Sequence, residues 1–288
     1  MTEWPIGLST GCFYKTSIFE CLQPIRDAGF RTIEVCSFPA HLDYHNHASV
    51  KRAGELIQEY DFEPFSFHAP FADHIDITSL DAGVRQAAIQ EILRAADAAA
   101  LMRVRHFVIH PGPEKGDLPY AERLRRMENA AAALNQVSSH CKQLGIRLVL
   151  ENMLPHLFFG HARDVMWVLG ALETTEVGIC LDTGHAHLSG DLSTVVHKLS
   201  GHLWMVHASD NHGRFDDHLP PGEGQIAWPA FIEQLDRLHF QGTFILEIAG
   251  ESNISAVLER AQRSRRFLED ISRGRSVAQL QKGPEVAP

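Results

Sequence analysis

The chain has 288 residues, of which 44% are hydrophobic and 22% are charged. These values are typical of a globular protein and exclude a disordered or fibrous one. The formal net charge of -10 provides no general attraction to a nucleic acid backbone. No run approaches the ~18 uninterrupted apolar residues of a membrane span, and the N-terminus lacks the apolar segment of a signal peptide. We therefore expect a cytoplasmic protein with no membrane partner, for which nucleic acid is a disfavoured partner.

Several function classes lack their sequence signatures. There is no P-loop, no G-x-S-x-G nucleophile elbow and no H-E-x-x-H zinc helix, so nucleotide hydrolysis, serine chemistry and helix-borne zinc proteolysis have no support. The five cysteines are widely spaced and form no C-x-x-C pair, which favours reduced thiols.

Eight short apolar runs alternate with segments of helical period along the chain. The apolar runs are residues 6–9, 32–35, 64–67, 106–109, 147–150, 177–181, 203–206 and 243–246. Helical periodicity is found in residues 18–28, 49–60, 80–101, 120–144 and 228–238. Such alternation predicts a parallel sheet. Eight units with no G-x-G-x-x-G after the first run favour an α/β fold of one (β/α)8 TIM barrel over an open doubly wound sheet.

The barrel is expected to occupy residues 1–275 as one catalytic domain. A length of 288 residues leaves no need for a second domain, because a (β/α)8 barrel takes about 250 residues. Residues 276–288, which end in Lys-Gly-Pro-Glu-Val-Ala-Pro, are predicted to be a flexible C-terminal tail.

In six consecutive units, a side chain able to bind a metal directly follows the apolar run. These side chains are His68, His110, Glu151, Asp182, His207 and Glu247. Because the C-terminal ends of barrel strands converge on one face, we predict that the six meet in one pocket. Glu151 and Glu247 each follow three apolar residues, where an unpaired carboxylate would be costly to desolvate. The mixture of imidazoles and carboxylates suits a zinc or manganese ion.

Further candidates lie near the same predicted strand ends. His185 comes three residues after Asp182, while Asp216 and His218 lie in the long segment after the seventh run. Turn residues in segment 219–224, Leu-Pro-Pro-Gly-Glu-Gly, indicate a compact lid or a ligand-bearing loop. Four other histidines are expected to be ordinary helix, loop or solvated residues and receive no role: His41, His45, His47 and His187.

With these motifs the sequence resembles the xylose-isomerase-like barrel superfamily, which holds sugar and sugar-phosphate isomerases and epimerases together with the endonuclease IV class of abasic-site nucleases. The resemblance spans nearly the whole chain. It is carried by residues 66–70, 109–112, 150–152, 180–185, 206–207, 216–218, 222–224 and 246–247.

The resemblance implies a set of metal ligands. In the epimerase branch one cation is held by residues that match Glu151, Asp182, His207 and Glu247, and the two glutamates exchange protons with a substrate carbon. The nuclease branch holds three zinc ions, and its additional ligands match His68, His110, His185, Asp216 and His218. The resemblance therefore implies a divalent metal cofactor, manganese or zinc, with one to three ions.

Two departures disfavour the nuclease branch. Residues 9–14, Ser-Thr-Gly-Cys-Phe-Tyr, stand where a glycine- and serine-rich DNA-contacting loop is expected, and residues 37–42 lack a DNA-reading segment. We predict a metal-dependent isomerase or epimerase of a small sugar, keto-sugar or sugar phosphate, working through an enediolate. Glu151 and Glu247 are its expected catalytic acid-base pair, and His185 is expected to bind substrate oxygen or a second metal.

Three alternatives stay open at the level of sequence. The same enolate could expel a β-hydroxyl, which would make the protein a dehydratase or eliminase of a keto-sugar or keto-inositol. The chain could instead be an abasic-site nuclease, or a non-catalytic metal- or carbohydrate-binding barrel, because a fold does not fix a function. The sugar, the metal and a possible homo-oligomer are also undetermined.

Overall fold

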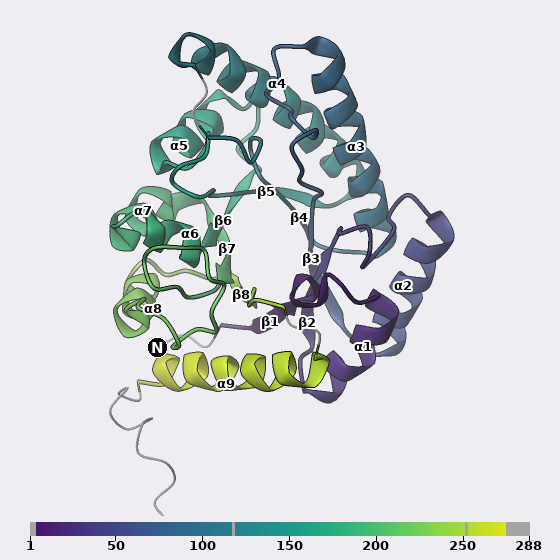
Figure 1. The fold of residues 1–288 in the computed structure, drawn as a ribbon, viewed down its shortest axis with the longest axis vertical. Coiled ribbons are helices and arrows are strands. Elements are labelled where there is room, and N and C mark those ends of the chain that lie inside the picture. The colour runs from purple at the N-terminus through teal and green to yellow at the C-terminus, as the bar shows by residue number, and fades with distance from the viewer. Residues whose placement is uncertain (1–3, 117–118, 251–252, 275–288) are drawn as a thin grey trace, which may run out of the picture.

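The computed structural model describes residues 4–116, 119–250 and 253–274, and within these residues eight parallel strands close into a barrel in chain order (Figure 1). The strands are β1 (Ile6–Ser9), β2 (Thr32–Cys36), β3 (Glu63–His68), β4 (His106–Ile109), β5 (Arg147–Glu151), β6 (Gly178–Asp182), β7 (Leu203–Ala208) and β8 (Thr243–Leu246). β1 pairs with both β2 and β8, which closes the barrel. The predicted (β/α)8 architecture is confirmed, while the predicted tail over residues 276–288 lies outside the described residues.

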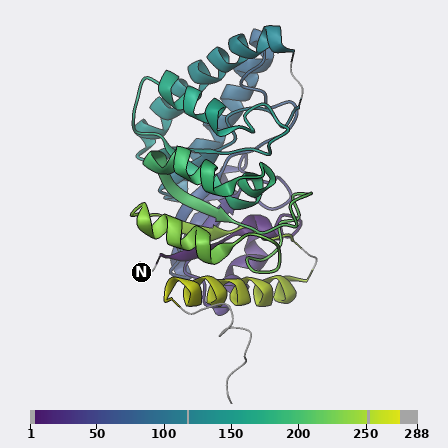
Figure 2. The same cartoon turned by 90° about the vertical axis from the view of Figure 1, so that its left-hand side faces the viewer.

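Helices form a ring around the barrel (Figure 1). They are α1 (Ile18–Asp27), α2 (His47–Glu59), α3 (Ala82–Leu101), α4 (Tyr120–Leu144), α5 (Ala162–Ala171), α6 (Thr183–Leu188), α7 (Leu192–Leu199), α8 (Trp228–Arg237) and α9 (Ile254–Ser272), with the short 3-10 helices η1 (Thr10–Phe13) and η2 (Ser200–His202). The last helix, α9, packs against α1 and α8 beside the first strand (Figures 1 and 2). None of these described helices is long and apolar enough to cross a membrane.

Local capping chemistry sets several helix ends. The Asn46 side chain accepts hydrogen bonds from the first backbone N–H groups of α2, and Asp81 does the same for α3. Each cap satisfies donors that the helix itself leaves unpaired. Gly145 ends α4 in the left-handed region at φ 76°, a conformation that glycine adopts without a steric penalty.

Two layers of side chains fill the inside of the barrel. The lower layer is a separate buried cluster contributed by β3 to β8, namely Phe65, Val108, Val149, Cys180, Met205 and Ile245. Successive side chains of a strand point to opposite faces, so residues two apart share a face. Five members of the lower layer are each followed, two residues later in the chain, by a predicted metal ligand. These ligands are His110, Glu151, Asp182, His207 and Glu247. The apolar layer therefore forms a floor beneath the predicted site.

Some strands extend further than predicted. His68, Glu151 and Asp182 are the last residues of β3, β5 and β6, and His207 is the penultimate residue of β7, rather than residues that follow the strands. The reason is that sheet pairing continues through them, as in the pairing of Asp182 with His207. The sheet therefore holds the backbone of these side chains in place.

The expectation that His41 is solvated is wrong. Its side chain is buried, and its Nδ1 atom lies 2.6 Å from the carbonyl oxygen of Thr16 and 3.2 Å from that of Phe13. The imidazole N–H thus satisfies backbone carbonyls beside η1, an arrangement that only the tertiary fold creates. His45 and His47 are exposed, as expected.

We predict that Phe244→Ala lowers the free energy of unfolding by about 3–5 kcal/mol. Phe244 is buried in β8, and its ring lies 5.6 Å from the Trp4 ring and 6.1 Å from the Phe240 ring, so truncation leaves a cavity. The control is Leu124→Ala on the exposed side of α4, which should change stability by less than about 0.5 kcal/mol. Urea unfolding followed by circular dichroism measures both, and equal losses would contradict the assignment of the core.

Candidate metal centre at the mouth of the barrel

Glu151 occupies the centre of the cluster at the C-terminal ends of the strands. Its Oε2 atom lies 3.1 Å from His68 Nε2, 3.3 Å from His207 Nδ1 and 3.6 Å from His110 Nε2. The residue as a whole is only 1% exposed. Imidazoles from three other strand ends therefore surround one buried carboxylate.

His207 links Glu151 to the opposite side of the barrel. Its Nδ1 atom lies 3.1 Å from Glu247 Oε2 as well as 3.3 Å from Glu151 Oε2. Asp182 completes this group from β6, with its Oδ1 atom accepting a hydrogen bond of 2.6 Å from the backbone N–H of His185. Four strands thus bring Glu151, Asp182, His207 and Glu247 together.

A third part of the cluster is built on Asp216. Its Oδ2 atom lies 3.0 Å from His218 Nε2 and 3.3 Å from His185 Nε2. The other ring nitrogens are also engaged, because His185 Nδ1 contacts the Asn152 carbonyl oxygen at 2.9 Å and His218 Nδ1 contacts that of Glu247 at 3.1 Å. These contacts fix both rings against the first two parts of the cluster.

The nine residues predicted from the sequence are brought together in three groups, in each of which one candidate ligand atom per residue lies within 4.8 Å of the others. The groups are His68–His110–Glu151, Glu151–Asp182–His207–Glu247 and His185–Asp216–His218. The buried thiol of Cys180 lies within the same distance of Glu151 and His207. His187, to which no role was given, is a residue of α6.

Unpartnered atoms test whether this cluster fits a cation. Among the described residues, Asp182 Oδ2, Asp216 Oδ1, His110 Nδ1 and His207 Nδ1 are buried and lack a hydrogen-bond partner of good geometry. Buried polar atoms rarely stay unpaired in native proteins. Zinc takes imidazole nitrogens and carboxylate oxygens at about 2.0–2.2 Å, so ligand atoms that share an ion lie roughly as close as the 3.1 Å and 3.3 Å contacts of His207. The residues therefore fit a divalent cation.

Charge coupling shifts the pKa values of the cluster strongly. Burial raises the pKa of Asp182 to about 6. Burial also opposes charge on Glu247, but His207 beside it brings the pKa of Glu247 down to about 2. Burial would lower the pKa of His68 and of His218, yet Glu151 raises that of His68 to about 9 and Asp216 raises that of His218 to about 10. Without a cation, protons on the imidazoles thus compensate the carboxylates.

Two residues that were not predicted from the sequence support the cluster. Glu34 in β2 is fully buried and lies 3.0 Å from His207 Nε2 through its Oε2 atom. Asp210, just after β7, accepts hydrogen bonds from the backbone N–H groups of Asn211, Gly222 and Ile226 and from Trp228 Nε1. The only sequence signal for Glu34 is a charged residue inside the apolar run Thr-Ile-Glu-Val-Cys.

Asp210 fixes the segment between β7 and α8 that carries Asp216 and His218. Its backbone also pairs with that of Leu219 through two hydrogen bonds of 2.7 and 2.8 Å. Gly224 packs so closely that a Cβ atom there would lie 2.3 Å from Asp210 Oδ1. The turn residues in segment 219–224 thus wrap around a buried carboxylate.

A pocket of about 310 Å³ opens beside the cluster. Its lining includes His68, Asp216, His218 and Glu247 together with the aromatic residues Tyr14, Phe38 and Phe71. The rings of Tyr14 and Phe38 meet edge to face with their centroids 5.2 Å apart. Polar and ionisable groups therefore share the lining of this pocket with aromatic rings, in a space suited to a small molecule.

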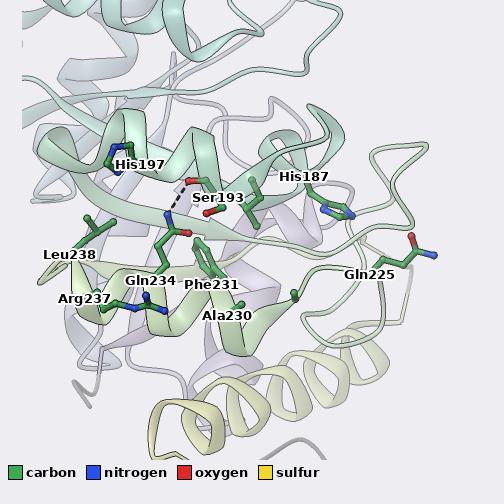
Figure 3. A pocket seen from close by; sticks show the side chains of 11 residues that line it. His187, Ser193, His197, Gln225, Ala230, Phe231, Gln234, Arg237 and Leu238 are labelled. Atoms are coloured by element: carbon green, nitrogen blue, oxygen red, sulfur yellow. Dashed lines mark hydrogen bonds between the residues drawn. The ribbon is translucent and has the colours of Figure 1, made fainter.

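A groove of about 520 Å³ lies elsewhere, over α7 and α8 (Figure 3). Its lining includes His187, His197, Phe231 and Gln234, and the Gln234 side chain donates a hydrogen bond to the backbone oxygen of Ser193 across it. The nine candidate ligands do not line this groove. The groove over α7 and α8 is therefore separate from the candidate metal centre at the mouth of the barrel.

Known proteins that are similar to this chain share its barrel architecture. The family model described as xylose isomerase-like TIM barrel matches residues 22–271. Uncharacterized protein MJ1311 of Methanocaldococcus jannaschii is 27% identical over 94% of this chain and 91% of its own length. A D-tagatose 3-epimerase-like protein superposes with a TM-score of 0.79 at 24% identity, over 92% of this chain and 98% of its own. The IOLI protein with a bound zinc atom superposes with a TM-score of 0.79 at 15% identity, over 92% of this chain and 98% of its own.

The pKa shifts predict how stability changes with pH once any cation is removed. In chelator-treated protein, His68 and His218 have folded pKa values of about 9 and 10 against an ordinary value of 6.5. A raised folded pKa contributes stability that is complete below the unfolded pKa and is lost as pH rises through the folded pKa. We expect the Tm to fall between about pH 7 and pH 9.5, measured by differential scanning calorimetry.

His68→Gln is the matched variant for this measurement. It removes one of the four imidazoles whose pKa is raised, namely His68, His185, His207 and His218, so its Tm should fall less steeply over the same pH interval. A Tm of the parent protein that stays level or rises across the interval would contradict the charge pairing described for the cluster.

Proposed function

Given that this chain belongs to the xylose isomerase-like TIM barrel family, we propose that it is a divalent-metal-dependent isomerase or epimerase of a small sugar, keto-sugar or sugar phosphate. The observation that carries the proposal is the convergence of two carboxylates, Glu151 and Glu247, on His207 Nδ1 at 3.3 and 3.1 Å. Paired carboxylates in a water-poor site are suited to moving a proton.

The pocket supports a small polyhydroxylated substrate. Its volume of about 310 Å³ lies at the lower end of ligand pockets. The rings of Tyr14, Phe38 and Phe71 offer apolar faces to the C–H side of a sugar, while His68, His218 and Glu247 offer polar partners to its oxygens. A substrate held in this pocket would lie beside Glu247, which lines it.

The two glutamates differ in access to the substrate. The side chain of Glu247 is 23% exposed and lines the pocket, whereas that of Glu151 is 2% exposed and lies among the histidines. We therefore assign Glu247 the removal of the proton from the carbon beside the carbonyl, after which Glu247 holds that proton, and we assign a protonated Glu151 the delivery of a different proton from the cluster side. Delivery to the same carbon gives epimerisation, and delivery to the neighbouring carbon gives isomerisation.

Glu151, Asp182, His207 and Glu247 would hold the principal cation. When bound, it would supply positive charge that stabilises the enediolate oxygens of the substrate. Zinc and manganese both accept this ligand set, and the bound zinc of the IOLI protein supports zinc. His185, which contacts Asp216 at 3.3 Å, would bind a substrate oxygen or belong to a further cation site.

Two other reactions are chemically compatible with this site. Loss of a β-hydroxyl from the same enediolate would make the protein a dehydratase or eliminase. The three ligand groups that share or adjoin Glu151 favour a second candidate function, which is hydrolysis of a phosphodiester such as an abasic site in DNA, since clustered cations stabilise attacking and leaving oxygens.

The first test is Glu247→Gln, which keeps the size of the side chain but removes the base. We expect it to reduce deuterium incorporation from heavy water into ketose substrates by about 10²–10⁴-fold, the usual contribution of a general base. Nuclear magnetic resonance of the recovered sugars measures the incorporation. Glu233→Gln on the exposed side of α8 is the matched control and should exchange normally. Full exchange by Glu247→Gln would refute the assigned base.

The second test separates the two candidate functions on one preparation. Purified without chelator, the protein is analysed for metals per chain and assayed on ketoses and on abasic-site DNA. For the proposed isomerase, we expect His185→Ala to keep the principal cation, to impair sugar turnover and to leave DNA uncut. About three zinc ions per chain together with DNA cleavage that His185→Ala abolishes would instead establish the nuclease.

A further inference from the structure

Glu34 is a carboxylate buried inside the barrel, at a strand position where an uncharged side chain would serve the packing equally well. It lies in the middle of β2, its residue is 0% exposed, and it stands in register with Ser9 of β1 and Ser66 of β3. A carboxylate taken out of water without partners is strongly destabilising. The neighbours that it contacts should therefore reveal what it does.

Three donors surround the Glu34 carboxylate. Ser9 Oγ donates to Oε1 at 3.1 Å, Ser66 Oγ donates to Oε2 at 2.8 Å, and His207 Nε2 lies 3.0 Å from the same Oε2. Since a carboxylate only accepts hydrogen bonds, the hydrogen of the third bond sits on His207 Nε2. The side chains of Glu34 and His207 are both 0% exposed, so water does not compete for this bond.

The other nitrogen of the His207 ring faces the ligand cluster. Nδ1 lies 3.1 Å from Glu247 Oε2 and 3.3 Å from Glu151 Oε2, and it has no hydrogen bond of good geometry among the described residues. A neutral imidazole with its hydrogen on Nε2 carries a lone pair on Nδ1. The contact with Glu34 thus decides which nitrogen is available to a cation.

We propose that Glu34 is a positioning residue, which holds His207 with its hydrogen on Nε2 so that Nδ1 is the atom that binds the cation. This inference rests on the cation-binding part of the proposed function and is independent of the reaction. A carboxylate behind a metal-binding histidine fixes the ring orientation and raises the basicity of the ligand, and its loss typically weakens metal binding 10–100-fold.

Serine residues make this arrangement rigid. Ser9 and Ser66 occupy the two neighbouring strands at the level of Glu34, and their hydroxyls use lone pairs of the carboxylate that His207 leaves free. The orientation of the carboxylate is therefore set before the cation arrives. A neutral amide at position 34 could still accept from His207 and place its NH2 group toward the Ser9 hydroxyl, but it would lack the negative charge that raises the basicity of the ring.

The experiment measures zinc affinity by competition with a chelator of known affinity, in the parent protein and in Glu34→Gln. We expect the tightest site to bind zinc about 10–100-fold more weakly in Glu34→Gln. Glu63→Gln is the matched control, because Glu63 lies in the neighbouring β3 at the far end from the ligands and pairs with Arg105. Its zinc affinity should equal that of the parent. Unchanged affinity in Glu34→Gln would overturn the proposal.

A second measurement reads the state of the ring directly in the parent protein and uses a variant only to assign its signal. In zinc-loaded parent protein labelled with ¹⁵N-histidine, long-range ¹H–¹⁵N spectra report which ring nitrogen carries hydrogen. We expect His207, identified by its absence from the spectrum of His207→Asn, to show hydrogen on Nε2 and zinc on Nδ1. Zinc on Nε2 would refute the proposal, whereas absence of sugar turnover would refute only the proposed reaction.

Discussion

Side chains of a strand alternate between its two faces, and in a closed barrel every second residue points inward. This alternation is the constraint on which the site depends. Val149 and Ile245 lie in the apolar layer, and Glu151 and Glu247 follow them on the same face two residues later. A slip of one residue in the register of β5 or β8 would turn a ligand out of the barrel. Closure between β1 and β8 brings distant segments together.

The second determinant of the site is the balance of buried charge. The carboxylates inside the barrel and at its mouth are largely withdrawn from water, and they are stable there because imidazoles lie beside them, as His207 does beside Glu34, Glu151 and Glu247. Each imidazole can hold a proton or give its lone pair to a cation, so the same geometry serves both states. Metal binding to such a cluster displaces protons and depends on pH.

The segment between β7 and α8 supplies two of the candidate ligands. Asp216 and His218 lie after β7 rather than on a strand, so sheet pairing does not fix them. Their position depends on Asp210, which gathers backbone donors from both ends of the loop and a Trp228 side-chain donor from α8. The loop thus acquires a fixed shape from a buried polar network, which is specific because each of its donors needs its acceptor.

The sequence by itself determined the alternation of strands and helices, the barrel and six of the nine candidate ligands, because hydrophobic period and the repeated placement of His, Asp or Glu after an apolar run are local properties. His185, Asp216 and His218 were predicted instead from their proximity to the same strand ends and from the family resemblance. The sequence did not reveal Glu34, Asp210 or the burial of His41, since each acts through a contact with a residue far away in the chain. Only the tertiary structure decided which candidate ligands share a group. It also decided that Glu247 lines the pocket while Glu151 does not, and that His207 turns its Nδ1 atom toward both glutamates. These depend on distances across the closed barrel, and a linear pattern carries no information about such distances until the strands are in register.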